Sequence, residues 1–394
     1  MAPILHVVGA RPQFVKVAAL LRATSRPELH SVIHTGQHYD PGLSKIFFDE
    51  LGIPSPRAHL GVGGGSHGAQ TADMLKALEP VLQSTLDATC VVYGDTNSTL
   101  AAALAAAKLG MRLVHVEAGL RAGDRRMPEE INRIVTDHVS DVLLCPTPAS
   151  VVQLAREGLT LGVHLVGDVM LDVALTEAPR ARATPLGRYL AGETDLPPPP
   201  FTAAMLPPAG YFLATIHRAA NTDDPEVLAR LVSGLAGLGA PVVWPMHPRT
   251  REAMARNGLR APLDVHTVDP LGYLEFSALL QGARAVLTDS GGVQKEAWFA
   301  GKPCVTLRDS TEWIETLAGG WNTLVGDDLE ALRSAIARPA PLGSPDLSSY
   351  GGGSAAKRCI DLIERGAGGS GRAQVCGDGG ALNLGPTSGI SARL

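Results

Sequence analysis

The chain has 394 residues and carries 39 Asp and Glu against 34 Lys and Arg, which gives a formal net charge of −5. This length exceeds what one ordinary hydrophobic core accommodates, so we expect two domains. The slightly acidic balance gives no indication of nucleic acid or an anionic membrane as a partner. An anionic ligand would therefore have to rely on local arginines and on helix N-termini.

Other global features predict a soluble, cytoplasmic protein. The N-terminal sequence MAPILHVVGARPQF indicates a first strand rather than a signal peptide, and no apolar run reaches membrane-spanning length. The five cysteines have neither the spacing of a disulfide framework nor that of a zinc site. Three of them lie in apolar runs, as buried small side chains do. We expect no bound metal.

Short apolar runs that end in turn residues alternate with helical patterns through the first half of the chain. The predicted strands are 4–9, 31–36, 89–94, 113–118, 142–147 and 163–167. The predicted helices are 15–23, 68–86, 98–109, 129–139 and 150–157. This alternation is typical of a parallel sheet wound with helices.

A second series of the same kind follows a proline-rich connector at 196–210, where proline blocks regular hydrogen bonding. Its predicted strands are 211–216, 241–246, 264–268, 285–288 and 303–307, and its predicted helices are 225–238, 273–280 and 292–300. The predicted fold class is α/β, with two doubly wound domains and a cleft between them. We place the domains at 1–175 and 176–347, a closing helix that returns to the first domain at 348–365, and a disordered Gly- and Ser-rich tail at 366–394.

The segment RLVHVEAGLRAGDRRMPEEINR, residues 112–133, gathers charged side chains where a strand passes through a polar loop into a helix. It holds Glu117, Glu129 and Glu130 among several arginines, and VVYGDTNST places Asp95 at the end of the preceding strand. Proton abstraction beside a phosphorylated leaving group needs such carboxylates. Surface salt bridges are the alternative. Open α/β sheets, however, bind ligands at the carboxyl ends of their strands, which favours a site.

A glycine turn in TDSGGVQKEA predicts a phosphate cradle. A strand ends just before Ser290, and Gly291 and Gly292 lead into a helix whose first N–H groups and dipole favour an anion. Glu296 follows inside the first helical turns, where a carboxylate can accept from the two hydroxyls of a ribose. The alternative is an ordinary glycine turn with a surface glutamate.

A weaker anion site follows the first strand in GARPQFVK, which places Arg11 and Lys16 near a helix N-terminus. Basic residues at helix starts are also common on surfaces. No GxGxxG follows this strand, which argues against a dinucleotide cofactor.

Further polar residues fall at strand ends of both halves. IHRAAN ends a strand with His217 and Arg218, PMHP repeats the pattern with His247, and TGQHYD places Gln37 and His38 at the edge of the first domain. A lone histidine at a strand end is more often structural than catalytic, but two at equivalent strand ends favour a site. Metal ligation is unsupported, because no HxxxH or CxxC pair is present.

These motifs together resemble one known family. In order, GARPQ, TGQH, GDTNSTL, HVEAGLR, PEEINR, IHR, MHP, TDSGGVQKEA and TEWIE are similar to the motifs of the non-hydrolysing bacterial UDP-N-acetylglucosamine 2-epimerases, over almost all of residues 3–363. The resemblance implies two Rossmann-like domains in the glycosyltransferase-B arrangement, a UDP-sugar in the interdomain cleft, no cofactor, and a homodimer.

The resemblance also implies roles for individual residues. The catalytic set it implies is Asp95, Glu117, Glu129 and His217. The substrate-binding residues it implies are Arg11, Lys16, Ser290, Gly291, Gly292 and Glu296, to which we add Gln37, His38, Arg133, Arg218 and His247. The implied chemistry removes the proton at sugar C2 and expels UDP from C1, leaving a 2-acetamidoglucal, and UDP then adds back with a proton on the opposite face.

The chain also departs from the familiar family pattern. Gln13 and Ala220 stand where glutamates are usual, Trp313 replaces an arginine, and the loop before PEE is about two residues shorter. These features are similar to a subgroup that includes UDP-diacetamido-glucuronate epimerases. Arg125 and Arg126 in the short loop fit a C6 carboxylate, although both can equally face solvent or pair with Asp124 and Glu130.

UDP-GlcNAc is the leading substrate on family grounds, with the diacetamido uronate as the alternative. A hydrolysing epimerase that releases UDP, a UDP-sugar glycosyltransferase of the same architecture, and a non-enzymatic nucleotide-sugar sensor are the remaining alternatives. Three acidic residues in one domain favour proton transfer over displacement, and a sensor has no need for them.

Overall fold

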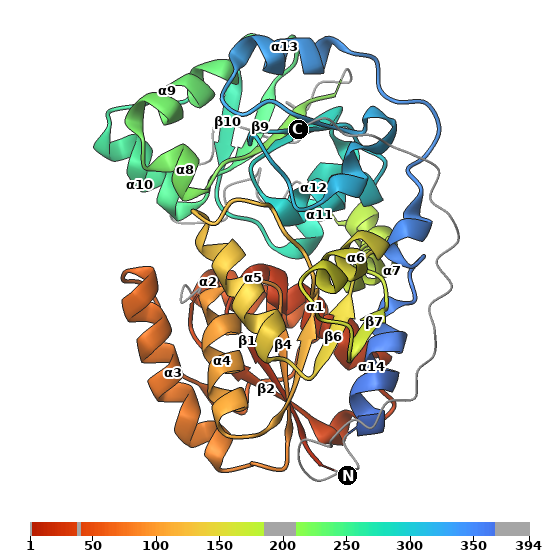
Figure 1. Ribbon diagram of the computed structural model, residues 1–394. Coiled ribbons are helices and arrows are strands. Elements are labelled where there is room, and N and C mark those ends of the chain that lie inside the picture. The colour runs from red at the N-terminus through yellow and green to blue at the C-terminus, as the bar shows by residue number, and fades with distance from the viewer. Residues whose placement is uncertain (1, 38–40, 185–209, 367–394) are drawn as a thin grey trace.

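The chain forms two α/β halves stacked end to end, each built on a parallel sheet (Figure 1). The structure is a computed structural model and describes residues 2–37, 41–184 and 210–366. The connector expected at 196–210 and the tail expected at 366–394 lie almost entirely outside these described residues. The boundaries placed at 175 and 347 stay a prediction.

The first half is a seven-stranded parallel sheet in the order β3-β2-β1-β4-β5-β6-β7. Its strands are β1 Ile4–Val8, β2 His30–His34, β3 Ala58–His59, β4 Thr89–Tyr93, β5 Arg112–Val116, β6 Val142–Cys145 and β7 Val163–Leu165. Its helices are α1 Arg11–Ala23, α2 Pro41–Leu51, α3 His67–Gln83, α4 Asn97–Lys108, α5 Pro128–Val139, α6 Pro148–Arg156 and α7 Val169–Ala183, with a short 3₁₀ helix at Pro27–Leu29. All five residues of β1 and of β4 are buried, as expected for strands covered by helices on both faces.

The second half repeats this plan with a six-stranded parallel sheet in the order β10-β9-β8-β11-β12-β13. Its strands are β8 Phe212–Thr215, β9 Val242–Pro245, β10 Val265–Val268, β11 Ala285–Thr288, β12 Cys304–Thr306 and β13 Asn322–Leu324. Its helices are α8 Ala219–Thr222, α9 Pro225–Gly234, α10 Pro248–Arg256, α11 Tyr273–Gly282, α12 Gly291–Phe299 and α13 Leu329–Ala337, with 3₁₀ helices at Ile314–Gly320 and Leu347–Tyr350. The predicted fold class is confirmed.

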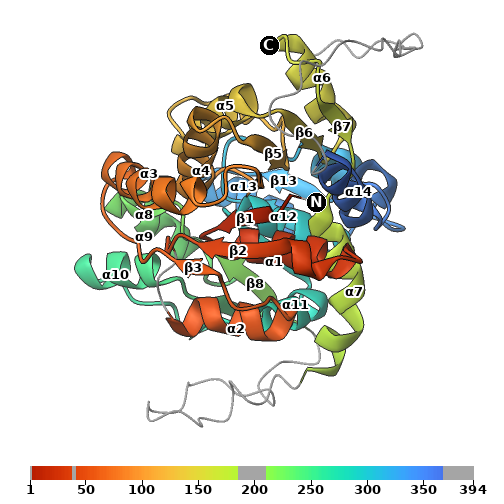
Figure 2. The same ribbon diagram turned by 90° about the horizontal axis from the view of Figure 1, so that it is seen from below.

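Both sheets reverse their strand order at equivalent places, between β1 and β4 and between β8 and β11. Ile4 of β1 pairs with His30 on one side and Thr89 on the other, and Thr288 of β11 pairs with Thr215 of β8. The loops after these strands therefore open into one crevice per sheet. Seen from below in Figure 2, elements of the first half overlie those of the second, and loops of both halves line one shared cavity.

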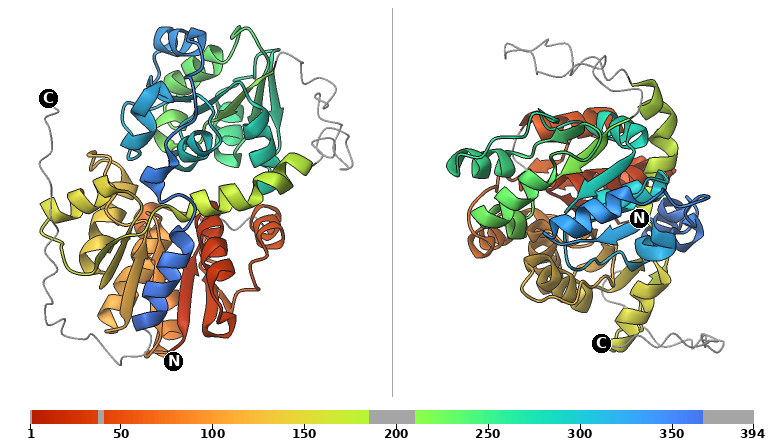
Figure 3. Two further views of the ribbon diagram at one scale, coloured as in Figure 1. Left: turned by 90° about the vertical axis from the view of Figure 1, so that its right-hand side faces the viewer. Right: turned by 90° about the horizontal axis from the view of Figure 1, so that it is seen from above.

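Two helices, α7 Val169–Ala183 and α14, lie next to the points where the chain passes between the halves. In Figure 3, α7 runs along the boundary between them, and it packs against α1 and α14 as well as α11 and α12. The last helix, α14 Ala355–Gly366, lies against the first half beside α1 and α7 (Figure 3). It buries Cys359, Ile360 and Ile363 there, and Arg112 donates to the carbonyls of Leu362 and Ile363. The C-terminal helix thus belongs to the core of the N-terminal half.

The sequence did not predict α2, α7, α8, α10, α13, β3 or β13. For α7 the reason is physical, because a helix covered from several sides has no single apolar stripe, and Pro179 interrupts its pattern. In the described part of the chain, no helix has the length and apolarity needed to cross a membrane. Within the same residues, no group of three or more His, Cys, Asp or Glu side chains is arranged to hold a metal ion.

Candidate active site

A cavity of about 780 Å³ lies between the two halves and is lined by loops and helix starts at the carboxyl ends of both sheets. Every predicted site residue within the described chain lines it. These residues are Arg11, Lys16, Gln37, Asp95, Glu117, Glu129, Arg133, His217, Arg218, His247, Ser290, Gly291, Gly292 and Glu296. His38 lies outside the described residues. The structure therefore brings residues from 11 to 296 together in one place.

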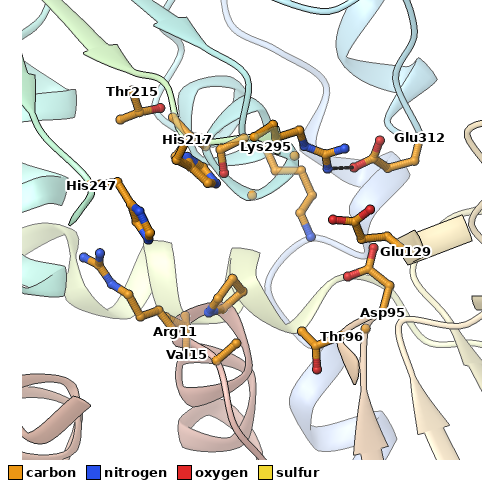
Figure 4. A pocket seen from close by; sticks show the side chains of 18 of the residues that line it. Arg11, Val15, Asp95, Thr96, Glu129, Thr215, His217, His247, Lys295 and Glu312 are labelled. Carbon is orange, nitrogen blue, oxygen red and sulfur yellow. Dashed lines mark ion pairs between the residues drawn. The ribbon is translucent and has the colours of Figure 1, made fainter. Parts of the chain in front are cut away.

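One wall of the cavity carries two neighbouring carboxylates. Asp95 follows β4 and Glu129 lies in the first turn of α5, and Figure 4 shows their side chains next to each other. Arg133, one turn further along α5, is buried and contacts Asp95 at 2.5 Å and Glu130 at 2.6 Å. Burial raises the pKa of Asp95, Arg133 opposes that rise, and the nearby charge of Glu129 adds to it. A raised pKa makes a carboxylate a stronger base than a free aspartate, which suits it to accept a proton.

Glu117 sits in a different electrostatic setting. Its Oε1 lies 2.5 Å from Lys16 Nζ on α1, and its Oε2 lies 2.7 Å from Lys295 Nζ on α12. Burial alone would raise the pKa of Glu117, but the two ammonium groups outweigh it and lower that pKa to about 2. Glu117 is therefore a fixed anion, held by a lysine from each half.

The backbone at Glu117 is also unusual. Among the residues that the structure describes, it is the one non-glycine residue with positive φ, at 74°. Its N–H and that of Ala118 both donate to the carbonyl of Leu144, at 3.0 and 3.1 Å. Side chains rarely occupy this left-handed region, and such strain persists where the surroundings enforce it, often in functional sites.

The opposite wall carries two histidines. The rings of His217 and His247 lie 5.4 Å apart between centroids, and Figure 4 shows both facing the cavity. The carboxylate of Asp289 accepts from the backbone N–H groups of His217 and Arg218 and lies 3.3 Å from His217 Nδ1. Burial lowers the pKa of His217, while Asp289 counteracts the shift. The imidazole is thus mainly neutral at pH 7.

The N-terminus of α12 points into the same cavity. Ser290 is its N-cap residue, and no side chain caps the first N–H groups of this helix. A Cβ at Gly291 would lie 2.2 Å from Glu312 Oε1, so glycine is needed there to let that carboxylate approach. Free N–H groups and the helix dipole together form an anion site.

Glu296, on the next turn of α12, is a carboxyl group poised near neutrality. Burial raises its pKa to about 7, although Lys295 and Arg11 act in the opposite direction. Arg11 reaches across from α1, donating from Nη2 to the carbonyl of Leu271 and lying 4.9 Å from the ring centroid of Phe47. This corner combines an acceptor of variable charge with a guanidinium group.

Glu312 is one of several charged residues lining the cavity that were not among the predicted site residues, and Lys295 is another. Glu312 follows β12 and contacts Arg308 at 2.8 Å and Arg218 at 3.8 Å. Burial would raise its pKa, but Arg308, Arg218 and Arg133 lower it to about 2. Glu312 is the first glutamate of the TEWIE motif, and that motif was the available signal.

The structure shows the contacts of two features that depart from the family pattern, Gln13 and the short loop before α5. Gln13 is buried and its side-chain oxygen accepts from the N–H groups of Gly9 and Ala10, while its amide donates to the carbonyl of Tyr93. A glutamate could not make that last bond without a proton. Arg126 is highly exposed and donates to both oxygens of Asp124, so it pairs with its loop neighbour. Glu130 instead accepts from Arg133 and from the backbone of the loop.

Comparison with known proteins identifies the family. The family model described as UDP-N-acetylglucosamine 2-epimerase matches residues 22–364. The chain belongs to this family. It is 46% identical, over 92% of its length and 99% of the relative, to UDP-2,3-diacetamido-2,3-dideoxy-D-glucuronate 2-epimerase of Pseudomonas aeruginosa. It is 37% identical, over 91% of its length and 98% of the relative, to UDP-N-acetylglucosamine 2-epimerase of Methanocaldococcus jannaschii.

Solved structures agree with this assignment. The crystal structure of the M. jannaschii enzyme with UDP-GlcNAc and UDP superimposes with a TM-score of 0.83 at 36% identity, covering 92% of this chain and 99% of that one. That of Neisseria meningitidis bound to UDP-GlcNAc gives 0.79 at 26% identity, covering 92% and 100%. The family assignment makes the chain an epimerase, and hence an isomerase.

Arg133 offers a test of the buried charges at this site. Replacing it by Met leaves Glu130 buried without its guanidinium partner and weakens the compensation of Asp95. We expect Arg133→Met to lower the free energy of unfolding by about 3–5 kcal/mol, the cost of breaking a buried ion pair. The matched control is Arg126→Met, which removes a solvent-exposed pair and should change stability little. Equal losses for both variants in urea unfolding would mean that the buried pair matters no more than the exposed one.

Proposed function

We propose that the chain is a non-hydrolysing epimerase that inverts C2 of a UDP-activated 2-acetamido sugar, interconverting UDP-GlcNAc and UDP-ManNAc for cell-surface polysaccharide. One observation carries the proposal. Carboxylates with different proton affinities, Asp95 and Glu117, face a cavity that also receives the uncapped N-terminus of α12. Proton transfer and stabilisation of a phosphate leaving group are thus available at one place.

The reaction balances without a redox partner. A base removes the C2 proton, the C1–O bond breaks, and UDP leaves with the bonding electrons as a C1–C2 double bond forms. In the second step UDP attacks C1 of the 2-acetamidoglucal and a proton is delivered to the other face of C2. The C2 proton of such a sugar is not acidic, so stabilisation of the leaving group must supply much of the catalysis.

The environments of the carboxylates suggest how they divide this work. Asp95, whose pKa burial raises, is suited to carry the proton, with Glu129 beside it. Glu117 stays ionised between Lys16 and Lys295, so it acts as a fixed negative charge that stabilises positive charge developing at C1. His217 is kept mainly neutral, and so can donate or accept a hydrogen bond.

The nucleotide is assigned to the second half of the cavity. The diphosphate would bind at Ser290, Gly291 and Gly292, where the N-terminus of α12 favours negative charge. Glu296 would accept from the ribose hydroxyls, and Arg11 lies close enough to influence its charge. Two structural relatives hold UDP-GlcNAc in their crystals, which supports a UDP-sugar here.

A second candidate substrate is the UDP-diacetamido uronate. The observation that favours it is the 46% identity to the P. aeruginosa enzyme named for this sugar. Arg126 lines the cavity but already has Asp124 as a bidentate partner, which weakens the charge-matching argument for the loop. Arg125 is exposed in the same loop and is not among the residues that line the cavity, so Arg126 would have to exchange its partner to meet a C6 carboxylate.

Two finer expectations belong to this proposal, a homodimer and a cytoplasmic location. The four cysteines within the described residues, Cys90, Cys145, Cys304 and Cys359, are buried free thiols, which suits a reducing compartment. The homodimer rests on the family resemblance. Light scattering of the purified protein determines its mass directly.

The reaction itself can be tested by proton NMR in D₂O without added cofactor. UDP-GlcNAc should convert to an equilibrium mixture with its C2 epimer, and deuterium should enter C2 as the product forms. Asp95→Asn and Glu117→Gln should retain UDP binding and lose turnover by a factor on the order of 10² or more. Full retention of the C2 proton would exclude elimination. Accumulation of free UDP and free sugar would indicate a hydrolysing enzyme instead.

The ribose assignment predicts a pH dependence. With a pKa of about 7, Glu296 is mostly protonated below that pH and ionised above it. Because ribose hydroxyls donate to the ionised form, UDP affinity of the wild type should fall on acidification below pH 7, by up to about tenfold per pH unit. The Glu296→Gln side chain cannot titrate, whereas the ionisation of UDP itself affects binding to both proteins equally. This variant is therefore the matched control when UDP affinity is measured by calorimetry. Parallel profiles for the two proteins would refute the assignment.

The identity of the sugar is tested by comparing kcat/KM for UDP-GlcNAc and for UDP-diacetamido-glucuronate. If the loop recognises a C6 carboxylate, Arg126→Ala should lower kcat/KM for the uronate alone, by roughly tenfold for one lost charge-assisted hydrogen bond. Arg125→Ala is the control, since this exposed side chain is not among those that line the cavity. A preference for UDP-GlcNAc that neither variant changes would leave the plain UDP-GlcNAc assignment in place.

A further inference from the structure

Lys295 links carboxylates from separate parts of the fold. Its ammonium lies 2.7 Å from Glu117 Oε2 and 2.5 Å from Asp168 Oδ2, and its side chain is 1% exposed. With Lys16 on the far side of Glu117, the four side chains form a row of alternating charge, Lys16–Glu117–Lys295–Asp168. Lys295 is the member of this row that comes from the second half, on α12.

Contacts on several sides hold the Lys295 side chain in one position. Its ammonium lies 3.7 Å from the ring centroid of Trp313, a cation–π contact in a buried setting. Asp168 is held in turn, because its Oδ1 accepts from the N–H of Met170 as the N-cap of α7. Figure 4 shows the Lys295 side chain descending from the second half toward the wall that carries Asp95 and Glu129.

In the first half, the backbone is adapted to the Lys16–Glu117 end of this row. Gly94 has φ 62°, and a Cβ there would lie 3.0 Å from Lys16 Nζ and 3.4 Å from Glu117 Oε1. Glu117 itself is held in the left-handed region. Two backbone adjustments therefore place one carboxylate where lysines from both halves can reach it.

From this geometry we propose that Lys295 is a positioning residue, which from the nucleotide-binding half holds the Glu117 carboxylate of the other half as an anion in a single orientation. The inference rests on the proposed function and assigns a role to a residue outside the set derived from the motifs. Lys295 acts through Glu117, so its loss should disturb the chemical step more than the binding of UDP.

The charges around Glu117 determine the sign of the expected pH effect. Lys16 on α1 and Lys295 on α12 contact it, Asp168 lies beyond Lys295, and Tyr350 faces it from the 3₁₀ helix before α14. Removing Lys295 takes away one of two compensating cations, while burial and Asp168 continue to disfavour the anion. Glu117 should then become protonated at higher pH than in the wild type.

The test compares Lys295→Met with Asp168→Asn and with the double variant. Asn preserves the N-cap of α7 and leaves the Lys295–Glu117 contact in place, so it is the matched control for disturbing the row without touching Glu117. For Lys295→Met we expect kcat to fall by about tenfold or more and the titration of Glu117, followed through the ¹³C resonance of its carboxyl carbon, to move to higher pH by about one unit or more. Because Lys295 also lowers the pKa of Glu296, UDP affinity is compared with and without Lys295 in a Glu296→Gln background, where it should stay within about threefold, less than the 1.4 kcal/mol of a tenfold change. Asp168→Asn should not raise the pH at which Glu117 titrates.

The outcomes separate the possible explanations. A loss of activity without a shift in the Glu117 titration, or one matched by an equal loss of UDP affinity in the Glu296→Gln background, would mean that Lys295 is only structural and would overturn the inference. If Lys295→Met fails to fold, the double variant, which removes one charge of each sign, must show the same shift in the Glu117 titration. Failure of the wild type to epimerise any UDP-sugar would overturn the proposed function instead, and is seen before any variant is made.

Discussion

A buried carboxylate must be compensated, and the compensation of Glu117 comes from both halves of the molecule. Lys16 supplies one cation from the first half and Lys295 supplies the other from the second. Each ammonium contacts one oxygen of the carboxylate, and the cost of desolvation is recovered only when such close partners satisfy the charge. The strained backbone at Glu117 and the missing side chain at Gly94 both serve this one arrangement. The charged groups that line the cavity between the sheets therefore also connect the two halves of the molecule.

The carboxyl groups that line this cavity differ in proton affinity although all of them face the same cavity. Arginine or lysine neighbours overcome burial at Glu312 and Glu117 and lower each pKa to about 2, whereas burial prevails at Glu296 and raises its pKa to about 7. The pKa of Asp95 is raised despite its contact with Arg133. Groups whose environments push their proton affinities apart are suited to different tasks. Here they allow one cavity to hold a permanent anion, Glu117, beside Glu296, a group that changes charge near neutrality.

The sequence was sufficient to predict the two parallel sheets and the edge at which the site lies. Strand ends such as those before Asp95 and Ser290 are marked by apolar runs that stop at turn residues, and the carboxyl ends of parallel strands necessarily meet at one edge. Elements without a periodic signal were missed, as α7 illustrates with its several covered sides and internal Pro179. Gln13 stood out in the sequence only as a departure, and its pattern of hydrogen bonds required coordinates.

Lys295 illustrates why the remaining site residues could not be predicted from the sequence. It lies inside the TDSGGVQKEA motif, whose glycines carry the sequence signal, yet its partner Glu117 is 178 positions away and in the other half. No local pattern encodes such a contact, because it depends on how two separately folded sheets are placed against each other. The same dependence has a functional side. If the halves separated, Glu117 would keep Lys16 and lose Lys295. Bringing the halves together and forming the Lys295–Glu117 contact are thus physically one event.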